Sequence, residues 1–365
     1  MQWMDLDFGG KLSRLDSYND ISFFNSGLSD QPIEEMALQT NDFTYKENIG
    51  ALYLSANRKF GEKWSTQLGV RMEDTQIDAF SDVSDLARND HYTNLFPTFY
   101  LSYNTSDFST FSLNYSRRIE RPTFYDLNPN LYYRNPFQAF EGNPFLGPAF
   151  IHNVELSNIY KNMVTKIYVS HEDNLFAEVP LPNINTNNTL FTIDNYIKRK
   201  RIGLSESYTY DAITWWTSTN NLDMNYSESE FDLEQEIGEQ AGYNATISTY
   251  NDFNLNASKT IIAGLNYWYQ FRGVEGIFKT RATSSLGLSL QYFLLEKDLN
   301  ITIRGDDLFR TAIERKSTNI NGVYQELRNF YDTRQFWLSV SYKFGNKNLN
   351  AGKGETGNEE EKARF

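Results

Sequence analysis

The chain has 365 residues, no cysteine and a formal net charge of −13 at pH 7. The absence of cysteine excludes disulfide scaffolds, thiolate metal sites and cysteine nucleophiles, and the negative charge argues against binding to nucleic acid, which needs clustered lysines and arginines. Mean hydropathy is −0.58, and no window of about 18 apolar residues occurs, so no transmembrane helix is expected.

Six segments alternate apolar and polar residues with a period of two. Because side chains alternate across a strand, each segment predicts a strand with one apolar and one polar face. The apolar positions are, in chain order, Met4/Leu6/Phe8/Leu12, Trp64/Thr66/Leu68/Val70/Met72, Phe111/Leu113/Tyr115, Leu286/Leu288/Leu290/Tyr292, Leu299/Ile301/Ile303 and Phe336/Leu338/Val340/Tyr342/Phe344.

Extending this pattern along the chain predicts about fourteen strands. They span 3–15, 43–59, 63–78, 92–104, 108–118, 150–160, 163–176, 190–209, 213–228, 240–257, 260–272, 278–294, 298–308 and 328–344. Several of them exceed the about ten residues that a strand needs to cross a bilayer, so their ends are expected to project beyond it. The outward pattern is weak in 163–176 and 213–228.

The predicted connections alternate between short and long. The short ones are tight polar turns, whereas the long ones are roughly 16–42, 79–91, 119–149, 177–189, 229–239 and 309–327, with a shorter loop near 273–277. Short periplasmic turns, long extracellular loops and a polar interior are typical of outer-membrane barrels. The aromatic content of 16% suits such a barrel, because tyrosine and tryptophan are favoured at membrane interfaces. We therefore predict an all-β, transmembrane, antiparallel up-and-down barrel.

The segment between Arg121 and Pro148 holds five of the nine prolines. Because proline cannot donate to a strand ladder, this segment is predicted to be a long structured loop. Arg117, Arg118 and Arg121 stand at its start. Two interpretations are open: a cationic, aromatic lip that contacts a ligand or orders a neighbouring loop, or arginines that pair with acidic wall residues while the prolines stiffen the loop.

Three stretches resemble the outer-membrane β-barrel family found at the C-terminal end of Bacteroidetes TonB-dependent receptors. They are YSRRIERPTFYDLNPNLYYRNPFQAFEGNPFLGPAFIHNVELS, FTYKENIGALYLSANRKFGEKWSTQLGVRMEDTQ and FWLSVSYKFG. The residues that carry the loop motif are Arg117, Arg118, Arg121, Pro122, Asn128, Pro129, Gly142, Asn143 and Pro144. The resemblance implies a barrel of about 22 strands that is filled by an N-terminal plug. This chain shows neither a plug nor a TonB box, so it is interpreted as the C-terminal two-thirds of such a barrel.

The two ends of the chain support the same interpretation. No signal peptide precedes the first strand pattern, so we expect the chain to lack its true N-terminus. At the other end, residues 1–345 are assigned to the barrel, and residues 346–365 are expected to be a polar, disordered periplasmic tail. Tyr342 and Phe344 resemble the terminal signal that the barrel-assembly machinery reads.

Catalytic and metal-binding chemistry finds little support. His91, His152 and His171 lie in separate segments, and no nucleophile motif occurs, so no enzyme activity, cofactor or metal is expected. The acidic stretch from Asp223 to Glu239 has two interpretations, a Ca²⁺-binding loop or, as we favour, a charged extracellular extension of a strand.

The favoured function is the barrel of a TonB-dependent receptor that takes up a large scarce nutrient of the siderophore, glycan or peptide class across the outer membrane of a Gram-negative bacterium. The alternative is a passive or structural barrel without energised transport. A soluble β-rich binding protein is disfavoured by the regular alternation of short turns and long loops. Expected partners are outer-membrane lipid, the barrel-assembly machinery, an extracellular ligand and a surface lipoprotein, with TonB only if a plug lies upstream, and no nucleic acid.

Overall fold

One large antiparallel sheet dominates the computed structural model, which describes residues 4–25, 34–35, 41–81, 86–183, 185, 187–233, 236–320, 322–344 and 359–364. The strands are β1 (Asp5–Ile21), β2 (Phe24–Asn25), β3 (Glu34–Glu35), β4 (Asn41–Phe60), β5 (Trp64–Ser81), β6 (Leu86–Ser106), β7 (Ser109–Glu120), β8 (Tyr132–Asn135), β9 (Gln138–Glu141), β10 (Ala149–Tyr160), β11 (Met163–Asn183), β12 (Asn188–Ile213), β13 (Trp216–Leu233), β14 (Glu236–Asn254), β15 (Ile261–Gln270), β16 (Gly273–Glu275), β17 (Phe278–Thr280), β18 (Thr283–Leu294), β19 (Leu299–Asp306), β20 (Glu314–Ile320), β21 (Val323–Asn329) and β22 (Gln335–Tyr342). The short helices are α1 (Phe124–Leu127), η1 (Leu295–Lys297) and α2 (Glu359–Lys362). Among the described residues, no helix is long and apolar enough to cross a membrane.

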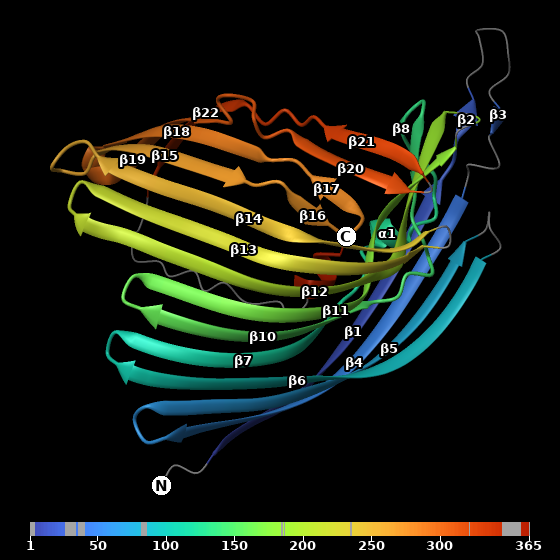
Figure 1. Cartoon of the computed structure of the whole chain (residues 1–365), viewed down its shortest axis with the longest axis horizontal. Coiled ribbons are helices and arrows are strands. Elements are labelled where there is room, and N and C mark those ends of the chain that lie inside the picture. The colour runs from blue at the N-terminus through green and yellow to red at the C-terminus, as the bar shows by residue number, and fades with distance from the viewer. Residues whose placement is uncertain are drawn as a thin grey trace.

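The main sheet is an up-and-down arrangement in chain order, as predicted. Two of its sixteen strands, β8 and β9, lie off the main path, which leaves fourteen in the order β1-β4-β5-β6-β7-β10-β11-β12-β13-β14-β15-β18-β19-β22. The strands curve into a deep arc whose short turns gather at one end and whose long connections gather at the other (Figure 1). In the described part of the chain, β1 pairs with β4 alone and β22 with β19 alone, so the arc is open between its first and last strands.

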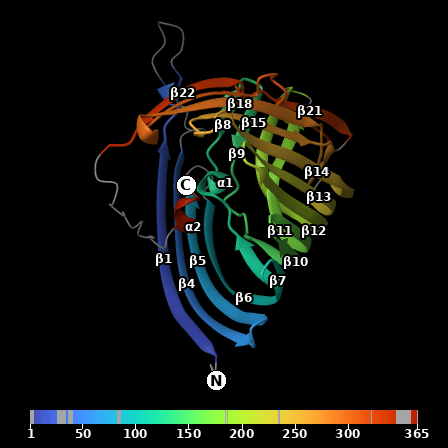
Figure 2. The same cartoon turned by 90° about the vertical axis from the view of Figure 1, so that its left-hand side faces the viewer.

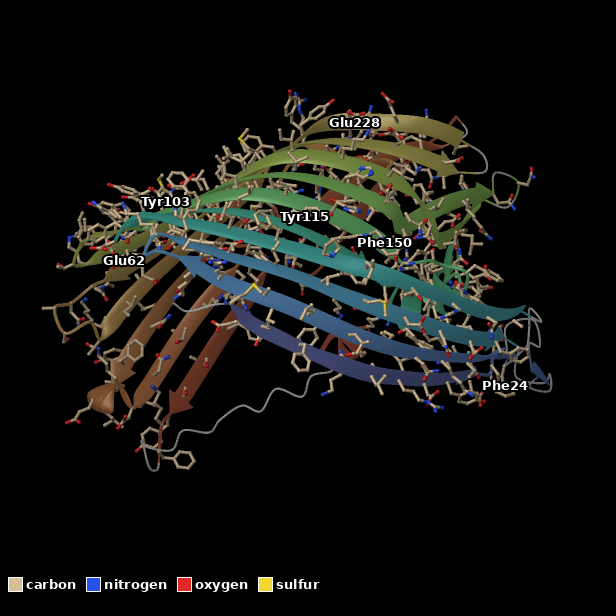
Figure 3. All side chains as sticks on the ribbon, turned by 90° about the horizontal axis from the view of Figure 1, so that it is seen from below. Phe24, Glu62, Tyr103, Tyr115, Phe150 and Glu228 are labelled. Atoms are coloured by element: carbon tan, nitrogen blue, oxygen red, sulfur yellow. The ribbon has the colours of Figure 1, made fainter. Side chains whose placement is uncertain are left out.

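The two faces of the arc differ in polarity, as the period-two pattern predicted. On β5, Leu68 and Met72 are 56% and 42% exposed on the outer face, whereas Glu73 and Thr75 are buried on the inner face. On the last strand both faces are exposed, but its apolar residues Leu338 and Val340 stand opposite Ile303 and Ile301 of β19. An apolar exterior and a polar interior are what a wall of strands in lipid requires. Figure 3 shows the outer face, with Glu62 near the short turns and Phe24 at the opposite end.

Toward the long-loop end this polarity reverses. The outer face of β5 continues as Asp74 and Asp78, while Ile77 and Ala79 are buried on the inner face. The inner residues belong to an apolar core that the loop between β7 and β10 completes; its buried members are Leu15, Phe43, Tyr45, Ile77, Ala79, Leu127, Phe140, Leu146, Phe191 and Ile193. The strands are thus longer than the part with an apolar outer face, in line with the expectation that their ends project beyond it.

Several loops expected near the long-loop end contain more strand than the sequence indicated. Pairing of β11 with β12 continues into the expected loop 177–189, from Ala177 opposite Asp194 to Asn183 opposite Asn188. The loops 273–277 and 309–327 contribute to a separate sheet in the order β16-β17-β20-β21, which buries Ile277 and Phe278. Accordingly, β18 begins at Thr283, and 328–334 lies outside the wall. These segments escaped prediction because strands in water need no apolar outer face, so the pattern that marks the wall is missing there.

The C-terminal tail returns to the concave side of the arc. Residues 345–358 lie outside the described residues, but 359–364 form α2 and the residues after it, and Figure 2 shows them beside α1 inside the arc. Arg364 is 9% exposed there. These six residues therefore differ from the expected disordered tail, because a buried ion pair and backbone hydrogen bonds hold them; the division into 1–345 and 346–365 stays a prediction.

Candidate functional site

The loop between β7 and β10 folds back onto the inner wall, and its first turn is fixed by helix capping. The Thr123 hydroxyl accepts a hydrogen bond from the Asp126 backbone N–H, and the Asp126 carboxylate accepts one from the Thr123 backbone N–H, which together form a capping box. Gly142 then crosses α1 so closely that a Cβ atom would lie 2.4 Å from the Asn128 carbonyl oxygen. The Gly-Asn-Pro element of the sequence therefore lies against the end of α1, at Asp126 and Asn128.

Other motif residues of this loop hold it together and join it to strands β6 and β12. The Asn143 side chain donates to the Ile193 carbonyl at 3.1 Å, and the Asn128 side chain accepts from the Asn130 backbone N–H at 3.1 Å. The Pro144 carbonyl accepts from Arg88 at 2.7 Å. Pro122 and Pro144 are buried, and Pro129 is half-buried. In addition, β9 pairs in parallel with β12, so this loop is a structured inward fold that narrows the arc.

The three arginines that open the loop take different environments. Arg117 stacks over Phe150 at 4.6 Å and donates to the Leu95 carbonyl at 2.6 Å, where β6 and β7 separate. Arg118 follows it on β7 and therefore points to the opposite side, where it lines a cavity on the inner face. Arg121 is buried in an ion cluster. The structure thus does not bring the three together as one lip.

This inner ion cluster joins strands β4 and β5 to the loop and to the chain terminus. Arg121 donates to Glu73 at 2.7 Å and to Thr75 at 3.2 Å. Arg364 pairs with Glu47, whose carboxylate is 1% exposed and also accepts from the Tyr45 hydroxyl at 3.2 Å. Arg71 approaches Glu73 at 2.6 Å. Each buried carboxylate therefore has a guanidinium partner, without which its burial would be strongly unfavourable.

A second ion cluster lies on β11 and β12. Glu172, also 1% exposed, accepts from the Arg199 Nε at 2.9 Å, from Arg201 and from the Ser170 hydroxyl at 3.1 Å. Beside it the Tyr168 ring lies over Gly203, where a Cβ atom would meet that ring at 2.4 Å. Glycine at position 203 thus lets the tyrosine lie flat on the wall.

A cavity of about 420 Å³ lies between the two clusters, on the inner face of the wall. Its lining residues come from β7, β10, β11, β12, the loop after β7 and the terminus after α2; they are Arg118, Ile119, Glu120, Arg121, Ile151, Asn153, Tyr168, Ser170, Arg201 and Arg364. Four of these residues are arginines and one is a glutamate. This cavity offers several charge-assisted hydrogen-bond donors to an anionic group.

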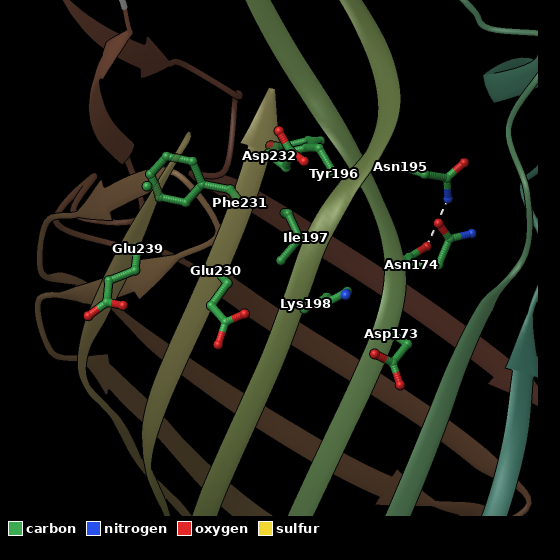
Figure 4. Close-up of a pocket in the computed structure, with 11 residues that line it drawn as sticks. Asp173, Asn174, Asn195, Tyr196, Ile197, Lys198, Glu230, Phe231, Asp232 and Glu239 are labelled. Carbon is green, nitrogen blue, oxygen red and sulfur yellow. Dashed lines mark hydrogen bonds between the residues drawn. The ribbon is translucent and has the colours of Figure 1, made fainter. Parts of the chain in front are cut away.

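A larger cleft of about 730 Å³ lies at the projecting ends of β11 to β14. Figure 4 shows Asp173, Lys198, Glu230 and Glu239 along one side of it. Lys198 and Glu239 stand directly opposite Glu230 on its two neighbouring strands. The acidic stretch singled out in the sequence is therefore built into β13 and β14 in its described part. Within the described residues, no group of three or more histidine, aspartate or glutamate side chains is arranged to hold a metal ion.

His152 and His171 stand directly opposite each other on β10 and β11, which their positions in separate sequence segments did not indicate. His91 contacts Asp74 at 2.8 Å, His171 contacts Asp173 at 3.1 Å, and His152 bonds the Tyr115 hydroxyl at 3.1 Å. At the end of the wall, Tyr342 and Phe344 are 57% and 88% exposed, and their ring centroids lie 6.4 Å apart. Their role in assembly stays a prediction.

Sequence reasoning missed most members of the inner clusters. The alternation of apolar and polar residues predicted an inward face for each strand that carries them. The residues on those inward faces are Glu47, Glu73, Glu172, Arg199 and Arg201. The signal was available, since charged residues alternating with apolar ones mark the lumenal face. Nothing in the sequence indicated which of them pair, least of all with Arg364.

The comparisons agree with this architecture. The model of the outer membrane protein beta-barrel family matches residues 2–342. The chain belongs to this family. Its place is the outer membrane of a Gram-negative bacterium. None of the curated proteins compared with the sequence matches it.

Solved structures similar to this family member are receptor barrels. They include the ferric-catecholate import receptor Fiu from E. coli K12, with a TM-score of 0.61, 11% identity, and coverage of 93% of this chain and 52% of that one. The siderophore receptor PiuA from Acinetobacter baumannii has a TM-score of 0.60 and 12% identity, with coverage of 93% of this chain and 53% of that one. The siderophore receptor PirA from Pseudomonas aeruginosa has a TM-score of 0.51 and 14% identity, with coverage of 92% of this chain and 65% of that one. The chain therefore spans about half to two-thirds of the lengths of these receptors. At these identities the likeness concerns the fold.

Proposed function

We propose that this chain forms the C-terminal part of the barrel wall of a Bacteroidetes-type TonB-dependent receptor, which takes up a large scarce nutrient of the siderophore, glycan or peptide class. The proposal also holds that further strands complete the wall and that a plug fills it. Its partners would be outer-membrane lipid, the barrel-assembly machinery, an extracellular ligand, a surface lipoprotein and, through the plug, TonB.

The observation that carries the proposal is the open arc of strands, whose interior holds the folded-in loop between β7 and β10. The arc follows import-receptor walls over 93% of its length, and β1 and β22 do not pair with each other among the described residues. Backbone groups at such edges would be left unsatisfied in hydrocarbon, so neighbouring strands are needed. Inside the arc, the loop between β7 and β10 narrows a wide lumen, as suits a receptor that retains its ligand.

Uptake by living cells tests the proposal against the passive barrel. Cells with and without the intact gene would be given labelled ferric enterobactin, a labelled heptasaccharide and a labelled peptide. Energised uptake should depend on the gene and should stop when an uncoupler collapses the proton gradient. Gene-dependent uptake that continues at the same rate with the uncoupler would instead identify a passive pore. The coding sequence upstream of Met1 gives a second test, since the proposal requires strands and a plug there.

A further inference from the structure

The inner cavity between the two ion clusters has a charge opposite to that of the whole chain. The chain carries −13, yet four arginines and one glutamate line this cavity. Three of these arginines form ion pairs, because Arg121 pairs with Glu73, Arg364 with Glu47 and Arg201 with Glu172. Glu172 also pairs with Arg199, so one carboxylate serves two arginines, and the unbalanced charge rests on Arg118 and on the Arg199–Arg201 pair.

Both Arg118 and Arg201 keep donors available for a ligand. Arg118 is exposed to the lumen and makes no ion pair in the part of the chain that the structure describes. Arg201 uses Nη2 for Glu172, yet its side chain is 33% exposed and lines the cavity, so the rest of its guanidinium group is open to a ligand there. A charge-assisted hydrogen bond to an anionic acceptor is stronger than one between neutral groups.

The strand register places neutral hydrogen-bonding side chains between the two arginines. Arg201 on β12 stands opposite Ser170 on β11, and Ser170 stands opposite Asn153 on β10. Arg118 on β7 faces Ile151, two residues before Asn153. Opposite residues in such a ladder lie about 5 Å apart, so the row Arg201–Ser170–Asn153 spans the floor of the cavity. Arg201 stands at one end of this row and Arg118 lies on β7 beyond the other end, so the two cations suit a molecule with more than one anionic group.

We propose that this cavity is a binding site for a small polyanion bearing carboxylate or phosphate groups, held by Arg118 and Arg201. This inference rests on the proposed uptake function and narrows its ligand to an anionic class. Guanidinium groups bind both carboxylate and phosphate in bidentate geometry, and a volume of about 420 Å³ lies in the range of small-ligand sites.

Direct binding to the intact protein in detergent tests the inference, with radiolabelled citrate as the probe and inorganic phosphate as its competitor. Maltose serves as the neutral probe. Citrate should bind, phosphate should displace it, and maltose should not. Arg118→Gln and Arg201→Gln should each weaken citrate binding about tenfold, as expected for the loss of a charge-assisted hydrogen bond. Citrate displaced by phosphate identifies a general anion site, and citrate resistant to phosphate identifies a carboxylate site; both support the inference.

Lys200→Gln is the matched control. Lys200 is the neighbour of Arg201 on β12, but its side chain lies on the outer face, 3.8 Å from Glu230, so this variant removes one positive charge without changing the cavity. It should leave citrate binding unchanged. The heat-modifiable gel shift of each variant reports whether the barrel is folded. Absence of citrate and phosphate binding to folded wild type, or equal losses in all three variants, would overturn the inference. Because this readout needs no transport, uncoupler-sensitive uptake without anion binding would refute the site and leave the receptor function standing.

Discussion

At the scale of single residues, Gly142 is the position where the folded-in loop is tightest. Its Cβ-less backbone lies against two carbonyl oxygens, and an added Cβ would stand 2.4 Å from Asn128 O and 2.7 Å from Asp126 O. We expect Gly142→Ala to lower the free energy of unfolding by about 1–3 kcal/mol, because backbone atoms must shift. Urea titration in lipid vesicles measures this. Gly50→Ala, whose Cβ would meet Leu12 at an ordinary 3.6 Å, is the control and should change little; equal losses would contradict the expectation.

Glu361 makes the docking of the chain terminus depend on pH. Burial opposes its ionisation, but Lys11, 2.7 Å away, together with hydrogen bonds from the backbone and from Ser13, lowers the pKa of the Glu361 carboxyl below its usual value. Because this pKa is lowered, the contact stabilises docking fully at pH values above the ordinary carboxyl pKa of about 4.3. The stabilisation is lost as the pH falls through the pKa that Glu361 has in the docked state. A spin label on Ala363→Cys, unique in this cysteine-free chain, should become mobile in acid.

The Glu361→Gln variant is the control for that experiment. Without the carboxyl group, label mobility should no longer change over the acidic range. A wild-type protein with unchanged label mobility in acid, or a Gln variant with the same response as wild type, would show that another group controls the docking.

At the scale of an element, β19 tests which face of the wall meets lipid. Ile301 stands opposite Tyr292 and Val340 on the apolar face, whereas Thr302 stands opposite Gln291 and Ser339 on the polar one. Ile301→Arg should cost roughly 2–4 kcal/mol of stability in a refolding assay, because it places a charge in the bilayer, while Thr302→Arg should cost much less. Comparable losses in the two variants would mean that the faces have been assigned wrongly.

The aromatic residues at the end of the last wall strand are expected to direct assembly. Tyr342 and Phe344 project together from the end of the wall, both well exposed. Replacing both with alanine should reduce insertion into the outer membrane, while removal of residues 346–365 should leave insertion largely intact. Fractionation of cell envelopes measures both. Normal insertion of the double variant, with loss of insertion on removing the tail, would place the assembly signal in the tail.

At the scale of the whole molecule, the open edges of β1 and β22 decide the assembly. In hydrocarbon each unpaired backbone group costs several kcal/mol, so an arc with two bare edges is unstable in a bilayer. Residues 1–365 expressed behind a signal peptide should therefore misassemble or be degraded, and adding the upstream coding sequence should restore a stable barrel. Size-exclusion chromatography and planar-bilayer recordings follow this. A monodisperse, ion-conducting barrel from residues 1–365 alone would contradict the prediction and favour the passive pore.

The sequence by itself determined the wall. Alternation is a local property, set by the pleat of each strand, so it predicted the outward face of β5 and β22 and the fourteen wall strands in order. It indicated less about the ends beyond the lipid, where β11 and β12 continue and where β16, β17, β20 and β21 form their own sheet. Those strands lie outside the stretch of wall with an apolar outer face, so no outward apolar row marks them.

The tertiary structure alone decided the contents of the arc. Arg117 and Arg118 are neighbours in sequence, yet one stacks on Phe150 and the other lines the inner cavity. Glu47 meets Arg364, which lies 317 positions away, and α2 docks where a disordered tail was expected. Strand alternation states which face a residue occupies, but the partner of a buried charge depends on which distant segments the curvature of the sheet brings to that face. That is why the sequence indicated an interior of charged residues and only the fold showed how they pair.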